Sequence, residues 1–160
     1  GDLVTVQGLC KQYPARGNAP PHKAVRNLSF GVREGEIFAL LGVNGAGKTT
    51  ALSILSGEFP MTRGRALLNH FDIQHQMPQA RQFMGYCPQF DGLLDLMSVR
   101  EHLCMYCRLR GIPSRLMPHV VARMMDHLVL SPYAAKTART LSGGNKRKLS
   151  MAVALIGGPK

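Results

Sequence analysis

The stretch GVNGAGKT, from Gly42 to Thr49, has the residue types and spacing for phosphate chemistry, because it fits G-x-x-x-x-G-K-[ST] in full. Glycines let backbone N–H groups turn toward an anion, and the dipole of a following helix favours negative charge. The Lys48 ammonium can reach the β- and γ-phosphates of a nucleotide, and the Thr49 hydroxyl can ligate Mg²⁺. A plain glycine turn joining strand to helix would leave Lys48 and Thr49 unexplained. The predicted nucleotide contacts are Gly42, Val43, Asn44, Gly45, Ala46, Gly47, Lys48, Thr49 and Thr50.

A second candidate anion site begins with LSGGNKRK near the end of the sequence. Ser142 is a preferred helix N-cap, and the two glycines that follow it leave the backbone bare for close approach. Three cations then crowd the first turn of the predicted helix: Lys146, Arg147 and Lys148. Cations are unfavourable at a helix N-terminus, so their clustering favours an anion that binds there. A solvated basic helix face remains the alternative for Lys146 and Lys148.

The chain carries 20 Lys and Arg against 9 Asp and Glu, a formal net charge of +11. This charge suits nucleic acid, an acidic membrane surface, a phosphorylated ligand or an acidic partner segment. The basic residues are scattered and no aromatic residues interleave with them, which argues against nucleic acid. No stretch approaches the ~18 apolar residues of a membrane span. Cys104 and Cys107 form a C-x-x-C near His102, but no second pair exists, so we expect free thiols and no structural metal.

The elements that position these residues follow from periodicity and turn signals. A glycine loop passes into a helix that Gly57 ends, and a loop rich in Pro and Gly is expected at 13–23. The apolar run IFALL is typical of a strand covered on both faces. We predict strands at 2–9, 24–32 and 37–41, a strand pair or strand and turn at 64–73, and a strand running into a loop at 83–89.

Two helices are predicted between the candidate anion sites. The first covers SVREHLCMYCRLRG, where Ser98 and Glu101 form a capping box and Gly111 ends the helix. The second covers SRLMPHVVARMMDHLVL, with Pro118 near its first turn. Its methionines are interpreted as core residues.

The sequence LSGGN, with 94 residues from Lys48 to Ser142, resembles the signature motif of ATP-binding cassette (ABC) proteins. The stretches LLGVNGAGKTT, GYCPQFDGLLDLMSVREHL and LSGGNKRKLSMAVALIGGPK are more specific still. They resemble the A-subfamily of ABC transporters, its second nucleotide-binding half in particular. Asn145 stands where other subfamilies usually have glutamine. Those transporters are large membrane proteins, and many of them export lipids.

The resemblance implies an α/β phosphate-loop NTPase fold of the ABC type, with an N-terminal antiparallel β region, a helical signature subdomain and an incomplete sheet. It divides residues 1–160, a partial nucleotide-binding domain, into three parts. Residues 1–88 hold the β region and phosphate-loop core, 89–144 hold the glutamine loop and helical subdomain, and 145–160 hold the helix after the signature.

The resemblance also implies roles for single residues. Tyr13 would stack on adenine, and Gln89 would contact Mg²⁺ and the attacking water. Lys48 and Gln89 are the implied catalytic residues, and Thr49 and Gln89 the implied Mg²⁺ ligands. In the family, two nucleotide-binding domains dimerise head to tail and sandwich ATP between one domain's phosphate loop and the other's signature. Here the signature residues would be Leu141, Ser142, Gly143, Gly144 and Asn145, which bind the partner domain's ATP.

The family pattern requires further acidic residues after Lys160, so we expect these 160 residues to lack the catalytic glutamate and to show no Lys48-dependent turnover. The whole protein is expected at the cytosolic face of a membrane, docked on transmembrane domains. One alternative is a soluble ABC ATPase of DNA repair or translation, against which GYCPQFD and LSGGNKRKLS argue. Another is a non-catalytic nucleotide-binding module. A phosphate-loop kinase would not account for LSGG or Gln89.

Overall fold

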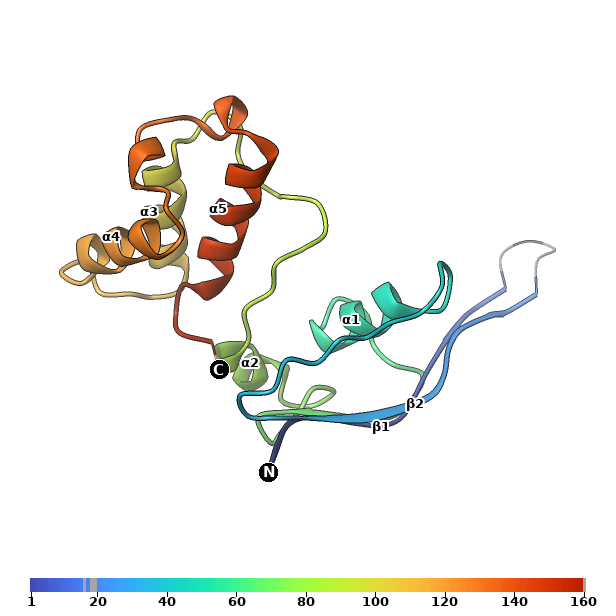
Figure 1. The fold of residues 1–160 in the computed structure, drawn as a ribbon. Helices are drawn as coiled ribbons and strands as arrows, with labels where there is room; N and C mark the ends of the chain where they lie inside the picture. Colours follow the sequence, from blue (N-terminus) through green and yellow to red (C-terminus); the bar gives the residue numbers. More distant parts are fainter. Residues whose placement is uncertain (16, 18–19, 160) are drawn as a thin grey trace. The chain divides into compact units, whose positions relative to one another are not determined.

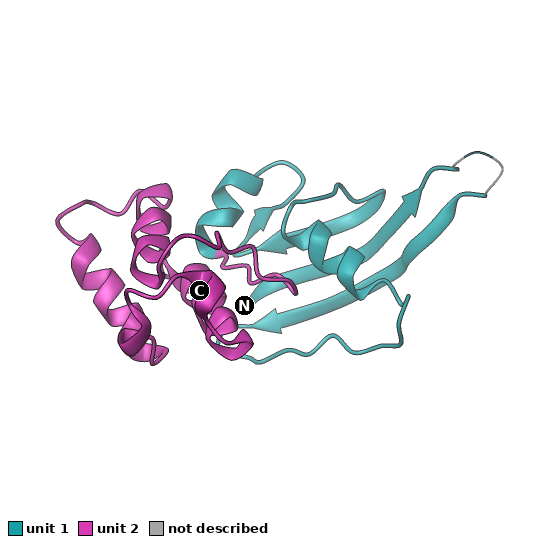
Figure 2. Cartoon of the chain, turned by 90° about the horizontal axis from the view of Figure 1, so that it is seen from above, with its two compact units in different colours: residues 1–83, 160 teal, residues 84–159 magenta. Residues whose placement is uncertain are grey.

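The fold was analysed in a computed structural model that describes residues 1–15, 17 and 20–159. The chain forms two compact units, residues 1–83 and 84–159 (Figure 2). Part of the predicted 13–23 loop, namely Arg16, Asn18 and Ala19, lies outside the described residues, as does Lys160. The predicted subdivision after residues 88 and 144 stays a prediction.

The first unit is built on an antiparallel sheet of four strands in the order β2-β1-β3-β4 (Figure 1). The strands are β1 Asp2–Tyr13, β2 His22–Arg33, β3 Arg63–Leu68 and β4 Phe71–Asp72. Apolar residues of these strands are buried within the unit, and a register shift between Val6 and Leu9 interrupts the strict alternation of β1. The buried apolar side chains of the sheet include Val6, Leu9, Val25, Ala66 and Leu68. The predictions for 2–9, 24–32 and 64–73 are confirmed.

Helix α1, Lys48–Leu55, lies on one side of this sheet (Figure 1). It buries Ala51 and Ile54 and ends just before Gly57, whose φ of 76° is the left-handed conformation that stops a helix. The predicted passage from glycine loop to helix is therefore confirmed. Helix α2, Met77–Ala80, and the 3₁₀ turn η1, Arg81–Phe83, complete the unit.

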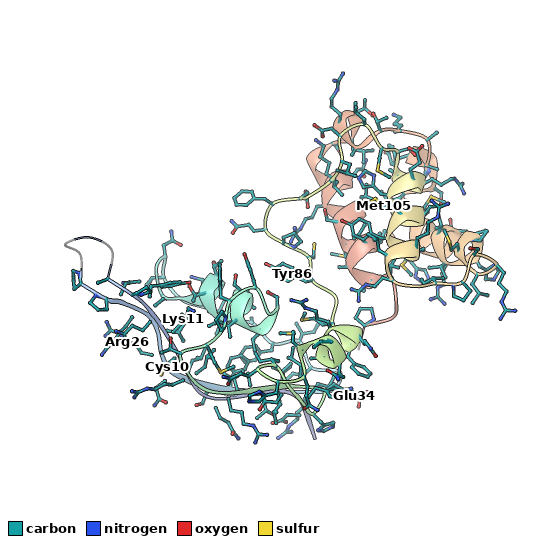
Figure 3. All side chains as sticks on the ribbon, turned by 180° about the vertical axis from the view of Figure 1, so that it is seen from behind. Cys10, Lys11, Arg26, Glu34, Tyr86 and Met105 are labelled. Carbon is teal, nitrogen blue, oxygen red and sulfur yellow. The ribbon has the colours of Figure 1, made fainter. Side chains whose placement is uncertain are left out.

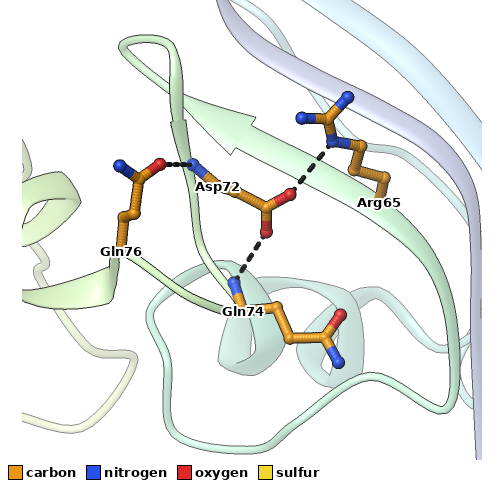
Figure 4. A network of polar contacts seen from close by, with 4 residues as sticks. All are labelled: Arg65, Asp72, Gln74 and Gln76. Atoms are coloured by element: carbon orange, nitrogen blue, oxygen red, sulfur yellow. Dashed lines mark hydrogen bonds and ion pairs between the residues drawn. The ribbon is translucent and has the colours of Figure 1, made fainter.

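The Asp72 carboxylate of β4 links strand β3 to the residues that follow β4 (Figure 4). Arg65 Nε donates to Asp72 Oδ2 at 3.0 Å, and the Gln74 N–H donates to Asp72 Oδ1 at 3.0 Å. Burial raises the pKa of Asp72, but the Gln74 N–H and the Arg65 guanidinium outweigh it, so the net pKa lies below its ordinary value. The Asp72 N–H donates in turn to Gln76 Oε1 at 3.2 Å.

The predicted strand at 37–41 is wrong. These residues have no regular structure, and Ile37 and Leu41 are 99% and 86% exposed. A strand needs a hydrogen-bonded neighbour and cover on its apolar faces, and none of the described strands pairs with this run. The Phe38 ring stacks on Phe30 of β2, with centroids 4.7 Å apart.

The predicted strand at 83–89 is also wrong, and the physical reason is the same. Phe83 belongs to η1 and stacks on Phe71 of β4, with centroids 5.7 Å apart. Residues 84–88 have no regular structure and pair with none of the described strands.

The second unit packs three helices: α3 Val99–Leu109, α4 Met117–His127 and α5 Gly143–Leu155. Two 3₁₀ turns, η2 Ser131–Tyr133 and η3 Ala138–Thr140, connect α4 to α5. The core cluster consists of Val99, Leu103, Cys107, Met117, Val121, Met124, Met125, Leu130, Leu141, Leu149, Ala152 and Ile156. Burial raises the pKa of the Cys107 thiol, and the neighbouring Cys104 adds to this shift.

Both predicted helices of this unit are present, and the ends predicted for the first are confirmed, whereas α4 is three residues shorter at each end than the predicted stretch. The Ser98 hydroxyl accepts from the Glu101 N–H, and the Glu101 carboxylate accepts from the Ser98 N–H, so the capping box is complete. Gly111 follows α3 with a φ of 71°, and Pro118 lies in the first turn of α4. Three of the methionines predicted to fill the core are buried: Met117, Met124 and Met125.

No helix within the described ranges is both long and apolar enough to cross a membrane.

Candidate nucleotide-binding site

The phosphate loop joins the irregular run at 34–41 to helix α1. The Lys48 side chain folds back over it, and Lys48 Nζ donates to the carbonyls of Gly42 at 2.6 Å and Val43 at 2.8 Å. The Ala46 N–H donates to the Val43 carbonyl at 3.2 Å and closes a turn within the loop. The ammonium is thus held at the loop by backbone oxygens and not by a carboxylate.

Gly47 sets the position of this loop against the sheet. It is the N-cap of α1 with a φ of 88°, which side chains other than glycine rarely adopt. A Cβ built there would come within 2.2 Å of the Ala24 carbonyl oxygen in β2. Only glycine therefore allows the helix N-terminus to approach β2 this closely.

The polar groups at the N-terminal end of α1 are backbone N–H groups, one ammonium and two hydroxyls. No side chain caps the helix, and its first turn contains no acidic residue. Lys48 supplies an ammonium, while Thr49 and Thr50 supply hydroxyls beside the N–H groups of the first turn. This donor set fits a phosphate group, and the exposed Thr49 hydroxyl fits an oxygen ligand of Mg²⁺.

Tyr13 closes strand β1, where it pairs with His22 of β2. Its side chain is half-buried, and Lys11 Nζ lies 5.2 Å from the centre of its ring. Lys11 belongs to the same strand and is labelled in Figure 3. The adenine contact of Tyr13 stays a prediction.

The signature residues lie at the start of α5. Ser142 is the N-cap, and its Oγ accepts from the Asn145 N–H at 3.3 Å. Leu141 is buried in the core of the unit, while the two glycines are exposed. Neither Gly143 nor Gly144 has a positive φ, and within the described chain no atom lies within 4 Å of a Cβ built on either. The fold of this unit therefore does not itself require glycine at these positions.

Gln89 is exposed on the irregular segment between Met84 and α3. The residues on both sides of it are held by Arg147 of α5, which donates to the Pro88 carbonyl and lies 3.4 Å from Asp91 Oδ1. Sequence reasoning missed this contact. The charges are opposite, but 56 residues separate Asp91 from Arg147, and no local pattern connects them.

The predicted site residues thus fall into two sets. The phosphate loop and Tyr13 belong to residues 1–83, and Gln89 and the signature belong to residues 84–159. The four cysteines are free, and the part of the chain that the structure describes contains no group of three or more His, Cys, Asp or Glu side chains that could hold a metal ion.

Comparison with known proteins agrees with these features. The sequence model of the ABC transporter family matches residues 25–160. The chain is 50% identical over 156 residues to the phospholipid-transporting ATPase ABCA3 of Rattus norvegicus, covering 98% of this chain and 9% of that protein. It is 48% identical over 158 residues to ATP-binding cassette sub-family A member 2 of Homo sapiens, covering 99% and 6%. The chain therefore spans less than a tenth of the length of these relatives.

Two solved structures share the fold. An ATP binding subunit of an ABC transporter superposes with a TM-score of 0.82 at 24% identity, covering 98% of this chain and 63% of that one. The cbiO1 subunit of Clostridium perfringens, part of the ABC transporter complex cbiONQ, gives 0.84 at 21% identity, covering 99% and 63%. The fold, the phosphate loop, the signature and the family match lead to one conclusion: the chain belongs to the ABC transporter family.

Proposed function

We propose that this chain is the ATP-binding part of an ATPase domain that powers a membrane transporter. The observation that carries the proposal is the donor set at the start of α1. A lysine ammonium, two threonine hydroxyls and an uncapped helix N-terminus meet there without an acidic residue in the first turn. The cofactors are ATP and Mg²⁺.

The chain's own residues divide the chemistry between binding and positioning. Lys48 exchanges the loop carbonyls of Gly42 and Val43 for phosphate oxygens and neutralises their charge. Thr49 would hold Mg²⁺ through its hydroxyl oxygen, and the ion would supply neutralisation of phosphate charge. Tyr13 stacks on the base, and Gln89 orients the attacking water.

Two such domains dimerise head to tail around ATP in this proposal. The glycines at 143 and 144 support dimerisation. Glycine lowers the stability of a helix by up to ~1 kcal/mol relative to alanine, and the unit has room for a Cβ at both positions, so its own packing does not require glycine there. A phosphate held on the partner domain would approach the backbone closely at residues 143 and 144, and this approach would account for glycine at both positions. Lys146 and Lys148 add positive charge to that approach.

We further infer that the glutamate that activates the water is not among the chain's 9 acidic residues. Five of them already accept hydrogen bonds, among them Glu36 from the Arg33 N–H and Asp126 from the Ser131 hydroxyl. Asp72 binds Arg65, Asp91 binds Arg147, and Glu101 closes the capping box.

The transported substrate is proposed to be a lipid, since the relatives named above include a phospholipid-transporting ATPase. The partners are a second nucleotide-binding domain and transmembrane domains, and the chain lies at the cytosolic face of the membrane.

The first test is ATP binding and hydrolysis. In the full-length protein reconstituted in lipid vesicles, Lys48→Ala should lower ATPase activity at least about a hundredfold, because the ammonium contacts the transferred phosphate. The matched control is Lys136→Ala, a lysine in the other unit that lies 5.4 Å from the Tyr133 ring. Equal activity in the two variants would refute the proposal. An ATPase rate that does not change when lipid is added would favour a soluble ATPase.

A further inference from the structure

The segment that carries Gln89 has no secondary structure of its own. Residues 84–88 pair with none of the described strands, and the first helix after them begins at Val99. The segment passes alongside α5 within the second unit (Figure 1). Its position therefore depends on contacts with the rest of that unit, which at its far end include backbone hydrogen bonds from the Ala138 N–H to Met97 and from the Arg139 N–H to Asp95.

Arg147 supplies the contact nearest to Gln89. Its guanidinium donates to the carbonyl of Pro88, the residue before the glutamine, and faces Asp91 Oδ1 at 3.4 Å, two residues after it. Arg147 itself is the second residue after Asn145 on the signature helix. A single side chain thus connects the start of α5 to both sides of Gln89.

A second contact fixes the far end of the segment. The Leu94 N–H donates to His102 Nε2 at 2.9 Å, and His102 Nδ1 lies 2.9 Å from the Ser98 carbonyl. With Nε2 accepting, Nδ1 carries the proton and donates to Ser98. His102 is fully buried in α3, so this end of the segment is anchored to the core. Arg147 controls the end near Gln89.

The two contacts differ in what they contribute to stability. The side chains of Arg147 and Asp91 are 46% and 21% exposed, and an ion pair so open to solvent adds little to the stability of the fold. A single guanidinium nitrogen, Nη1 of Arg147, makes both contacts, to the Pro88 carbonyl and to Asp91 Oδ1. The contact therefore fixes geometry more than it stabilises the fold.

We propose that Arg147 is a positioning residue that couples the signature helix to Gln89. This inference rests on the proposed function, in which the signature faces the partner's ATP and Gln89 serves the chain's own ATP. When the start of α5 moves on binding the partner's ATP, Arg147 carries Pro88 and Asp91 with it. The water-orienting glutamine then takes its place only when both sites are filled.

A double-mutant cycle in the full-length protein tests the coupling, with Arg147→Ala, Asp91→Ala and the double variant. Each single change should lower kcat roughly three- to tenfold while the KM for ATP stays within about twofold, because binding depends on the phosphate loop. The double variant should be no worse than Arg147→Ala alone, and Arg147→Lys should restore part of the loss. The matched control is Arg123→Ala, an exposed arginine of α4.

Hydrogen exchange separates this inference from the proposed function, because it needs no catalysis. Amides of residues 86–92, the end of the segment near Arg147, should exchange faster in Arg147→Ala than in Arg123→Ala, at similar melting temperatures. The positioning role would be overturned if Arg147→Ala left the exchange rates unchanged or if the effects of the two substitutions on kcat were additive. It would also be overturned if the loss of kcat followed the loss of melting temperature. If hydrolysis does not depend on Lys48, the proposed function fails, and the exchange result still decides whether Arg147 holds the segment.

Discussion

At the scale of single residues, the glycines of the two candidate anion sites differ in what their own fold demands. Gly47 has a φ of 88° and leaves no room for a Cβ beside the Ala24 carbonyl. Gly144 lies in a helix with open space around it. The first is explained within the chain, whereas the described structure gives no reason for the second.

This difference predicts opposite effects of the same substitution. Gly47→Ala should destabilise the first unit by about 1–3 kcal/mol and abolish ATP binding, because both φ and the 2.2 Å approach are unacceptable for alanine. Gly144→Ala should leave the chain equally stable or up to ~1 kcal/mol more stable. Thermal unfolding and binding of a fluorescent ATP analogue measure these effects. In the full-length protein, Gly144→Ala should nevertheless lose ATPase activity. A variant that keeps its full ATPase activity would contradict the proposed contact of the signature glycines with the partner domain.

At the scale of elements, the capped helices were predictable and the two unpaired strands were not. The capping box of Ser98 and Glu101 is a local signal, because all its partners lie within one turn. The run at 37–41 has the composition of a buried strand, but its structure depends on a neighbour that no local pattern supplies. The phosphate loop could likewise be predicted from spacing. The contact of Arg147 with Asp91 could not, since it depends on how α5 packs beside a segment far away in sequence.

The capping box predicts a pH-dependent stability of α3. Hydrogen bonds from the Ser98 N–H and hydroxyl hold the pKa of Glu101 below its ordinary value of 4.5. The stabilisation by the carboxylate is therefore fully present above pH 4.5 and is lost as the pH falls through the lower folded-state pKa. Glu101→Gln should be less stable than the wild type at neutral pH, with a gap that narrows in acid. Hydrogen exchange of α3 amides measures this gap, and Glu58→Gln in the other unit is the control. A gap that stays constant or widens in acid would contradict the assignment.

At the scale of the whole molecule, the chain divides its candidate sites between two units, and its first unit exposes apolar side chains next to the phosphate loop. Ile37, Leu41 and Val43 are 99%, 86% and 79% exposed. Neighbouring apolar side chains this open are unusual for a stable surface, and they favour association. The net charge of +11 opposes that association. Self-association should therefore become stronger as added salt screens the charge.

The exposed run therefore predicts that the 160-residue chain self-associates, and increasingly so with salt. Replacing Ile37 and Leu41 together by threonine should make it more monomeric, because the change removes apolar surface without touching Lys48 or the glycines of the loop. Sedimentation velocity at low and high salt measures the effect, with Leu109→Thr, an equally open leucine of α3 at 72% exposure, as the control. If the two residues are covered in the full-length protein, the same double substitution should lower its melting temperature there. A wild-type chain that stays monomeric at high salt would show that this run is tolerated as an ordinary surface.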